Sequence, residues 1–139
     1  NYGKGLKSTD YFNLGRSYYF NKDYTKADTL FAKVNELLPT WPNGFLWRAQ
    51  SNAQLDPDSK QGLAKPYYEK YIEVALADST NVDKYKNGLI ESYKYLGSYY
   101  YLVDKQTSVS KSNWLKVLEL APDDKQAKQV LEGLNQKPK

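Results

Sequence analysis

The sequence contains no cysteine, no histidine and no methionine. Without cysteine it can form no disulfide, no thiolate nucleophile and no cysteine-based metal site. Without histidine it lacks the commonest general base and the commonest metal ligand of proteins. No apolar run approaches the roughly 20 residues that a membrane-spanning helix needs. These absences predict a protein with no catalytic centre, metal site, cofactor or membrane span in this chain.

The residues that are present predict a folded domain. Hydrophobic residues make up 40% of the chain and charged residues 26%, which fits one domain over residues 1–139. The net charge of +4 is mild, and lysine and aspartate alternate along the chain, so the pattern disfavours a nucleic-acid partner. Because the chain begins at Asn1 and has no methionine, we expect it to be a piece of a longer protein.

A pattern of small and large apolar residues recurs along the chain. The first copy comprises Tyr11, Leu14, Gly15, Tyr18, Ala27, Phe31 and Pro39, and the third comprises Tyr93, Leu96, Gly97, Tyr100, Ser110, Trp114 and Pro122. The second copy is degenerate, because Arg48 stands where the first copy has Leu14 and Leu76 stands where it has the closing Pro39. Its second half, with Ala64 and Tyr68, returns three residues late. The spacing of three and four residues is that of one helical face and predicts helical hairpins.

This pattern resembles the tetratricopeptide repeat (TPR) family, whose repeat reads W-x2-L-G-x2-Y, then A-x3-F, then P. The resemblance implies an all-α fold, a right-handed α-solenoid of three hairpins over about residues 8–41, 42–78 and 79–122. A capping helix over about residues 123–134, with Asp123 as its N-cap, is expected to complete it. We expect the extra residues before the third copy to lie in long helices around residues 73–92.

The same pattern predicts which residues lie where paired helices touch. Small residues should allow close approach of the helices, namely Gly15, Ala49 and Gly97 in the first helices and Ala27, Ala64 and Ser110 in the second. Large residues should fill the space around them, including Tyr11, Tyr18, Phe31, Val34 and Leu37 in the first hairpin. Residues 21–23 should form a turn, and Pro66 places the start of its helix near Ala64 or Lys65.

The family resemblance implies a binding groove lined by the first helix of each hairpin. The groove positions that it projects onto this chain are Phe12, Arg16, Tyr19, Phe20, Trp47, Gln50, Lys94, Tyr95 and Tyr101. Aromatic residues and arginine dominate the energy of many interfaces, so we expect five of these positions to form the centre of the site. Those five are Arg16, Tyr19, Trp47, Tyr95 and Tyr101. The alternative is that several of them pack on neighbouring repeats.

Two more specific sites are disfavoured by the residues present. Asp56, Asp58 and Ser59 could suggest a calcium loop, but Tyr67 stands where the EF-hand pattern needs glutamate, so we expect a turn. Some family members hold the C-terminal carboxylate of chaperones with lysine, asparagine and arginine side chains. The corresponding positions here are Phe12, Arg16, Trp47, Glu91 and Tyr95, so the resemblance does not extend to that clamp.

The leading functional hypothesis is a protein-interaction scaffold that binds an unknown peptide or protein segment in the concave groove. A second hypothesis, from the abundance of tyrosine and tryptophan, is a glycan-binding or nutrient-uptake accessory module. A third is an enzyme whose catalytic domain lies outside this chain. The stretch over residues 62–71 resembles end segments of larger bacterial TPR proteins, which implies the cell envelope or periplasm rather than the cytoplasm.

Overall fold

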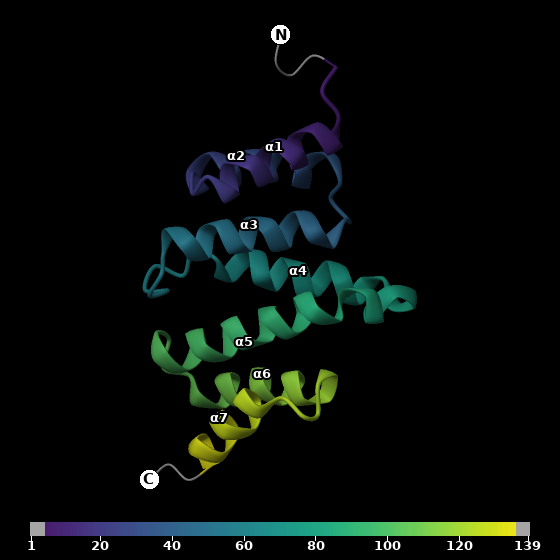
Figure 1. The fold of residues 1–139 in the computed structure, drawn as a ribbon. Coiled ribbons are helices and arrows are strands. Elements are labelled where there is room, and N and C mark those ends of the chain that lie inside the picture. The colour runs from purple at the N-terminus through teal and green to yellow at the C-terminus, as the bar shows by residue number, and fades with distance from the viewer. Residues whose placement is uncertain (1–4, 136–139) are drawn as a thin grey trace. The chain divides into compact units, whose positions relative to one another are not determined.

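The computed structural model describes residues 5–135, and over that range the regular secondary structure is all helical (Figure 1). This part of the chain holds seven α-helices, one 3-10 segment and no strand. The helices divide into two compact units, the first ending at Ala77 and the second beginning at Asp78. The predicted all-α fold is therefore confirmed.

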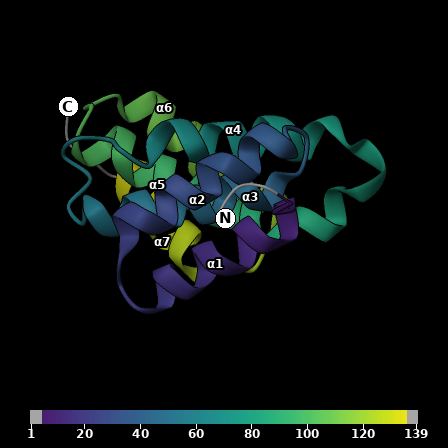
Figure 2. The same ribbon diagram turned by 90° about the horizontal axis from the view of Figure 1, so that it is seen from above.

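The first unit consists of two helical hairpins. Its helices are α1 (Ser8–Phe20), α2 (Tyr24–Leu37), α3 (Pro42–Leu55) and α4 (Lys65–Ala77). Helices α1 and α2 run antiparallel beside each other, as both ribbon views show (Figures 1 and 2). Helix α3 packs on α2, and α4 packs on α3. Each helix thus contacts its neighbours in sequence, which is the arrangement that a helical repeat predicts.

Short polar segments end and restart these helices as the sequence indicates. Between α1 and α2, Lys22 takes a left-handed conformation with φ of 65°, and the Asp23 carboxylate accepts the Lys26 N–H at 3.3 Å. Pro42 is the first residue of α3, where its missing N–H costs nothing. Helix α4 begins at Lys65, so Pro66 lies in its first turn, as expected.

The loop between α3 and α4 is organised by one buried carboxylate. Asp56 is 4% exposed, and its side-chain oxygens accept the N–H groups of Gln61 at 3.3 Å and Leu63 at 3.2 Å. These bonds satisfy the acid within its own loop, as burial of a carboxylate requires. The segment forms a turn, as the sequence predicts.

The second unit begins with the 3-10 segment η1 (Ser79–Tyr85), which leads into α5 (Lys86–Leu102). It continues with α6 (Thr107–Leu120) and α7 (Lys125–Asn135). Helix α5 packs on α6, and α6 packs on α7.

The prediction of long helices around residues 73–92 is wrong in part. Helix α4 stops at Ala77, because the Asp78 carboxylate binds the Thr80 hydroxyl at 3.0 Å and the Asn81 amide at 2.9 Å. Such local polar bonds compete with a continuous helix. Only the later residues of this segment extend α5.

The predicted small residues lie where helices touch. Ala27, Ala49, Ala64 and Ser110 are completely buried. A Cβ atom on Gly15 would lie 2.8 Å from the Phe31 ring, so this glycine allows α1 to approach α2 closely. These positions therefore act as the sequence pattern predicts.

Two of the finer structural predictions need correction. Leu37 is 45% exposed rather than part of the core, because it is the last residue of α2 and lies beyond the packed turns. The N-cap of α7 is Asp124 rather than Asp123, since the Asp124 carboxylate accepts the Ala127 N–H at 2.9 Å. Asp123 lies one residue too early for that bond and is fully exposed.

Candidate functional site

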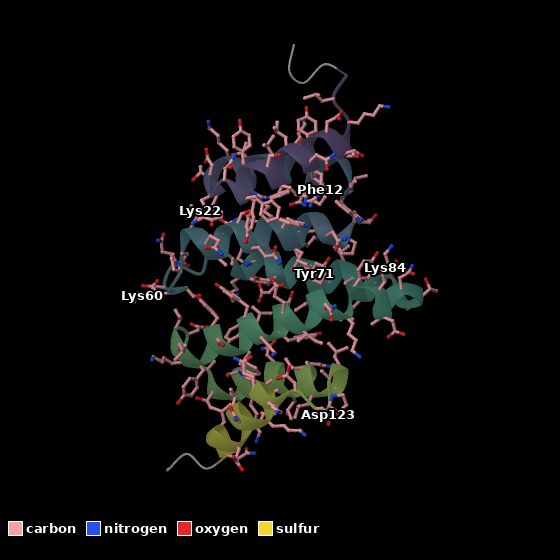
Figure 3. All side chains as sticks on the ribbon, viewed as in Figure 1. Phe12, Lys22, Lys60, Tyr71, Lys84 and Asp123 are labelled. Atoms are coloured by element: carbon pink, nitrogen blue, oxygen red, sulfur yellow. The ribbon has the colours of Figure 1, made fainter. Side chains whose placement is uncertain are left out.

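Five of the predicted groove residues come together on one surface of the first unit, which we call the α1–α3 aromatic face. Four of them, spaced so that they share one side of α1, are Phe12, Arg16, Tyr19 and Phe20. The fifth, Trp47, projects from α3 and contacts the residues of α1. Figure 3 shows Phe12 on the side of α1 that lies toward α3.

Trp47 is the centre of this face. Its ring centroid lies 6.0 Å from that of Phe12, 5.4 Å from Tyr19 and 5.8 Å from Phe20. The interplanar angles are 87°, 88° and 79°, so every one of these contacts is edge-to-face. This geometry suits the charge distribution of aromatic rings and is worth about 0.5–1.5 kcal/mol per pair beyond area burial. The face is therefore held in a defined shape before any ligand arrives.

The inner edge of the face joins the hydrophobic core. Phe31 of α2 is fully buried, and its ring lies 5.7 Å from that of Trp47 and 5.9 Å from that of Phe12. The outer edge is open, because Phe20 is 64% exposed. The face thus passes from a buried anchor to a solvent-exposed rim.

Arg16 supplies the charge of the α1–α3 aromatic face. Its guanidinium carbon lies 5.7 Å from the Phe12 ring centre and 5.5 Å from that of Trp47, within the range of cation–π attraction. The side chain is exposed, and within residues 5–135 it makes no ion pair or hydrogen bond. Its N–H donors are therefore available to an acceptor from outside.

Two aromatic residues of this surface were not predicted from the sequence. The ring of Trp41 lies 5.0 Å from Phe12, and that of Tyr24 lies 5.3 Å from Tyr19. Both belong to helix starts rather than to the projected positions on the first helices, which is why the repeat pattern missed them. The signal that could have found them is their place beside a turn, Trp41 directly before Pro42 and Tyr24 directly after the predicted segment 21–23.

A polar network fixes α3, and with it Trp47, to α2. The Arg48 side chain bonds the Asp28 carboxylate at 2.9 Å, and the Asn52 amide donates to the same oxygen at 2.7 Å. The Arg48 guanidinium also lies 4.3 Å from the ring centre of Tyr67, on α4. Arg48, the residue that departs from the repeat pattern, therefore connects three helices.

Gln50, also predicted for the groove, is half-buried one turn after Trp47.

The remaining predicted groove residues lie on α5, in the second unit. The Lys94 ammonium pairs with the Asp124 carboxylate at 2.8 Å, so this lysine connects α5 to the start of α7. The hydrogen bond from Lys94, followed by that from the Ala127 N–H, lowers the pKa of Asp124. The rings of Tyr95 and Tyr99 lie parallel, with centroids 6.3 Å apart and an interplanar angle of 13°.

Tyr101 lines a pocket of about 400 Å³ within the second unit. The buried Trp114 contributes to its lining, and α7 supplies Val130 and Leu134 on another side. The pocket is mostly apolar. It is a separate feature from the α1–α3 aromatic face, and each belongs to its own unit.

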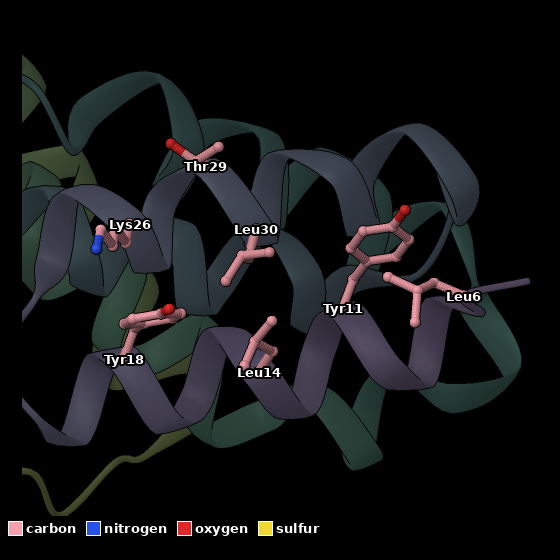
Figure 4. Close-up of a pocket in the computed structure, with 7 residues that line it drawn as sticks. All are labelled: Leu6, Tyr11, Leu14, Tyr18, Lys26, Thr29 and Leu30. Carbon is pink, nitrogen blue, oxygen red and sulfur yellow. The ribbon is translucent and has the colours of Figure 1, made fainter. Parts of the chain in front are cut away.

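A further hollow, of about 520 Å³, lies between α1 and α2 (Figure 4). It is lined by Leu6, Tyr11, Leu14, Tyr18, Lys26, Thr29 and Leu30. None of the predicted groove residues contributes to it. Tyr11 and Tyr18 were expected to fill the space between the paired helices, but they are half-buried and border an open hollow.

Across residues 5–135 there is no cluster of three or more acidic, histidine or cysteine side chains that could hold a metal ion. No helix in the same range is both long enough and apolar enough to cross a membrane.

No protein-family model matches the sequence, and no curated protein matches it. Among solved structures, the chain is similar to the C-terminal part of a TPR repeat-containing protein from Cytophaga hutchinsonii, with 46% sequence identity and a TM-score of 0.82. The chain has the tetratricopeptide repeat fold. The similarity covers 90% of this chain and 47% of that solved chain, so this chain spans about half the length of the fragment that it matches.

A second TPR structure shows how far the fold extends beyond sequence similarity. The first TPR of Spaghetti (RPAP3) matches with a TM-score of 0.69, over 94% of this chain and 91% of that one, at 18% identity. That protein was solved bound to an HSP90 peptide of sequence SRMEEVD. At this identity the likeness shows the TPR fold alone, and the predicted helical-repeat solenoid is confirmed.

Proposed function

We propose that this chain is a non-catalytic protein-interaction scaffold and that the α1–α3 aromatic face binds a peptide or protein segment. One observation carries the proposal. Five of the nine predicted groove residues meet on a single surface of the first unit, with Phe20 exposed at its rim and Arg16 lying over its rings. Aromatic residues and arginine are the types that most often dominate binding energy at interfaces.

The shape of the face also favours binding. Because Trp47 is held by three rings of α1 and by the buried Phe31, little side-chain freedom is left to lose when a partner docks. The polar network of Arg48 and Asp28 holds the helix that carries Trp47. A preorganised surface with an open rim is what a peptide site needs.

The ring geometry favours a peptide over the glycan alternative. Sugar rings stack on exposed, coplanar aromatic surfaces, whereas Phe12, Tyr19 and Phe20 meet Trp47 nearly at right angles. Such a surface presents ring edges and faces in several directions, which suits branched and aromatic side chains of a peptide.

The second unit contributes to the same proposal as a surface of its own. Tyr101 borders an apolar pocket, and Tyr95 lies against Tyr99. Lys94 can bind a partner only if an acidic group of that partner replaces the Asp124 carboxylate in its ion pair.

A peptide-display selection on the purified chain tests the proposal. Selected peptides should bind the wild-type chain and lose affinity for Phe20→Ser. The matched control is Leu37→Ser, because Leu37 is likewise an exposed apolar residue at the last position of its helix, at 45% exposure, and is not one of the residues that form the face. If the selected peptides bind both variants as tightly as they bind the wild-type chain, the proposed binding role of this face is contradicted.

A further inference from the structure

The charge distribution of the α1–α3 aromatic face identifies the kind of peptide that it fits. The predicted groove residues of the first unit are Phe12, Arg16, Tyr19, Phe20, Trp47 and Gln50, and this set contains one cation and no carboxylate. An exposed cation beside apolar rings, with no acid of its own surface to neutralise it, favours an anionic partner group.

The acids nearest in sequence are already engaged elsewhere. Asp10 accepts the Lys7 N–H at 2.8 Å, and Asp23 caps α2 through the Lys26 N–H. Asp28 is held by Arg48 and Asn52. Each of these carboxylates has a local role in the fold, so the first hairpin offers none of them to the Arg16 guanidinium.

The position of Arg16 also defines what must accompany the anion. Its guanidinium lies over Phe12 and Trp47, and the exposed Phe20 ring adjoins Trp47 at 5.8 Å. A guanidinium presents a planar fork of donors that matches one carboxylate with two parallel hydrogen bonds. The rings beside it can bury an apolar side chain on the neighbouring residue of the same peptide.

We infer that the first unit recognises an internal peptide segment in which one aspartate or glutamate adjoins a large apolar residue. This inference rests on the proposed peptide-binding function and adds the chemistry of the ligand. A single cation fits a single side-chain carboxylate, so the peptide needs no free C-terminus. The acidic group contributes selectivity, and the apolar neighbour contributes most of the buried area.

The selected peptides of the display experiment provide the test. Peptides with blocked termini should be enriched in Asp or Glu next to Phe, Leu, Ile or Trp, relative to the input library. For a synthetic blocked peptide of this type, replacing its Glu by Gln should weaken binding roughly two- to tenfold, because the ion pair is exposed. The difference should shrink as salt is raised from low to high concentration.

Variants of Arg16 separate the two proposals. Arg16→Gln should bind the Glu and Gln peptides equally, while Arg16→Lys should retain part of the preference; melting curves check that both variants fold. If selected peptides lose affinity for Phe20→Ser but show no acidic preference, the inference fails and the proposed function stands. Enrichment of basic peptides, or a strict need for a free C-terminal carboxylate, would also overturn the inference. If no selected peptide depends on Phe20, both proposals fail.

Discussion

The indole ring of Trp114 occupies the space where a side chain of residue 97 would begin. A Cβ atom built on Gly97 would lie 2.7 Å from Cδ1 of that ring, closer than real atoms approach. The contact is reinforced from the same side, because the Ser110 hydroxyl donates a hydrogen bond to the Gly97 carbonyl oxygen at 2.7 Å. Helices α5 and α6 are therefore joined at one closely packed point.

We predict that Gly97→Ala destabilises the chain by about 1–3 kcal/mol, since the added methyl group must displace the Trp114 ring. Gly97→Leu should cost at least as much. Gly133→Ala is the matched control: this glycine also lies in a helix, but its Cβ would meet nothing within 4 Å. The control should be neutral or stabilising by up to about 1 kcal/mol. Chemical denaturation measures both, and equal effects would disprove the packing role of Gly97.

Trp114 and Trp47 should differ in what their loss costs. Trp114 is 2% exposed, so Trp114→Ala should destabilise by about 3–5 kcal/mol. Trp47 is half-buried and borders the open face, so Trp47→Ala should cost less, about 1–3 kcal/mol, and also weaken peptide binding by ~1 kcal/mol or more. Melting and binding are measured on the same variants. If Trp47→Ala unfolds the chain as readily as Trp114→Ala, Trp47 is primarily a core residue.

Stability should fall in acid partly through Asp124. Its folded-state pKa lies below the ordinary value of 3.8, mainly because of the hydrogen bond from Lys94. A lowered folded pKa stabilises the native state above the unfolded pKa, and this contribution is lost as the pH falls through the folded pKa. Asp124→Asn keeps the helix-capping ability but removes the charge, so it should flatten the pH dependence of stability below about pH 5.

The neighbouring residue provides the control for this pH effect. Asp123→Asn should leave the acid-dependent loss of stability unchanged. That carboxylate is fully exposed, so solvent screens its ion pair with Lys128, in which the charged atoms are 3.8 Å apart. Denaturant unfolding at a series of pH values between about 2.5 and 7 measures the two variants. Identical pH profiles for Asp124→Asn and wild type would contradict the role assigned to the Lys94 pair.

Replacing Arg48 by leucine, which restores the repeat pattern, should lower the stability of this chain. Among the described residues, Arg48→Leu leaves the Asp28 carboxylate, which is 25% exposed, with the Asn52 amide as its remaining partner. We expect a loss of about 1–3 kcal/mol from the weakened network. The double variant Arg48→Leu with Asp28→Leu should recover much of this loss, since it removes both charges together. A stabilising effect of Arg48→Leu alone would show that the network is not needed.

The sequence predicted the helical repeat because its signal is periodic. Gly15, Ala27 and Trp114 occupy positions of the recurring pattern, and the structure places them at helix contacts or in the core. What it missed depended on local chemistry that has no period. The break after Ala77 arises from the side chain of Asp78. Helix α7 is capped by Asp124 rather than by the adjacent Asp123, and the sequence pattern does not distinguish these two aspartates.

The candidate site was predicted only as far as helical phase allowed. Phase on α1 grouped Phe12, Arg16 and Tyr19, and the structure brings these residues together with Trp47. Phase could not reveal that Trp41 joins the same surface from a helix start, or that Lys94 is engaged by Asp124. The location in the cell envelope and the glycan alternative stay predictions.

The network around Asp28 has a consequence for how the repeats can be ordered. A hairpin with leucine at the position of Arg48 would leave the Asp28 carboxylate of α2 without its cation, and a hairpin lacking Asp28 would leave Arg48 without its carboxylate. The first two hairpins therefore recognise each other by charge as well as by shape. Exchanging either for another copy of the repeat would preserve the helices and lose the match, so the hairpins of this chain are not interchangeable modules.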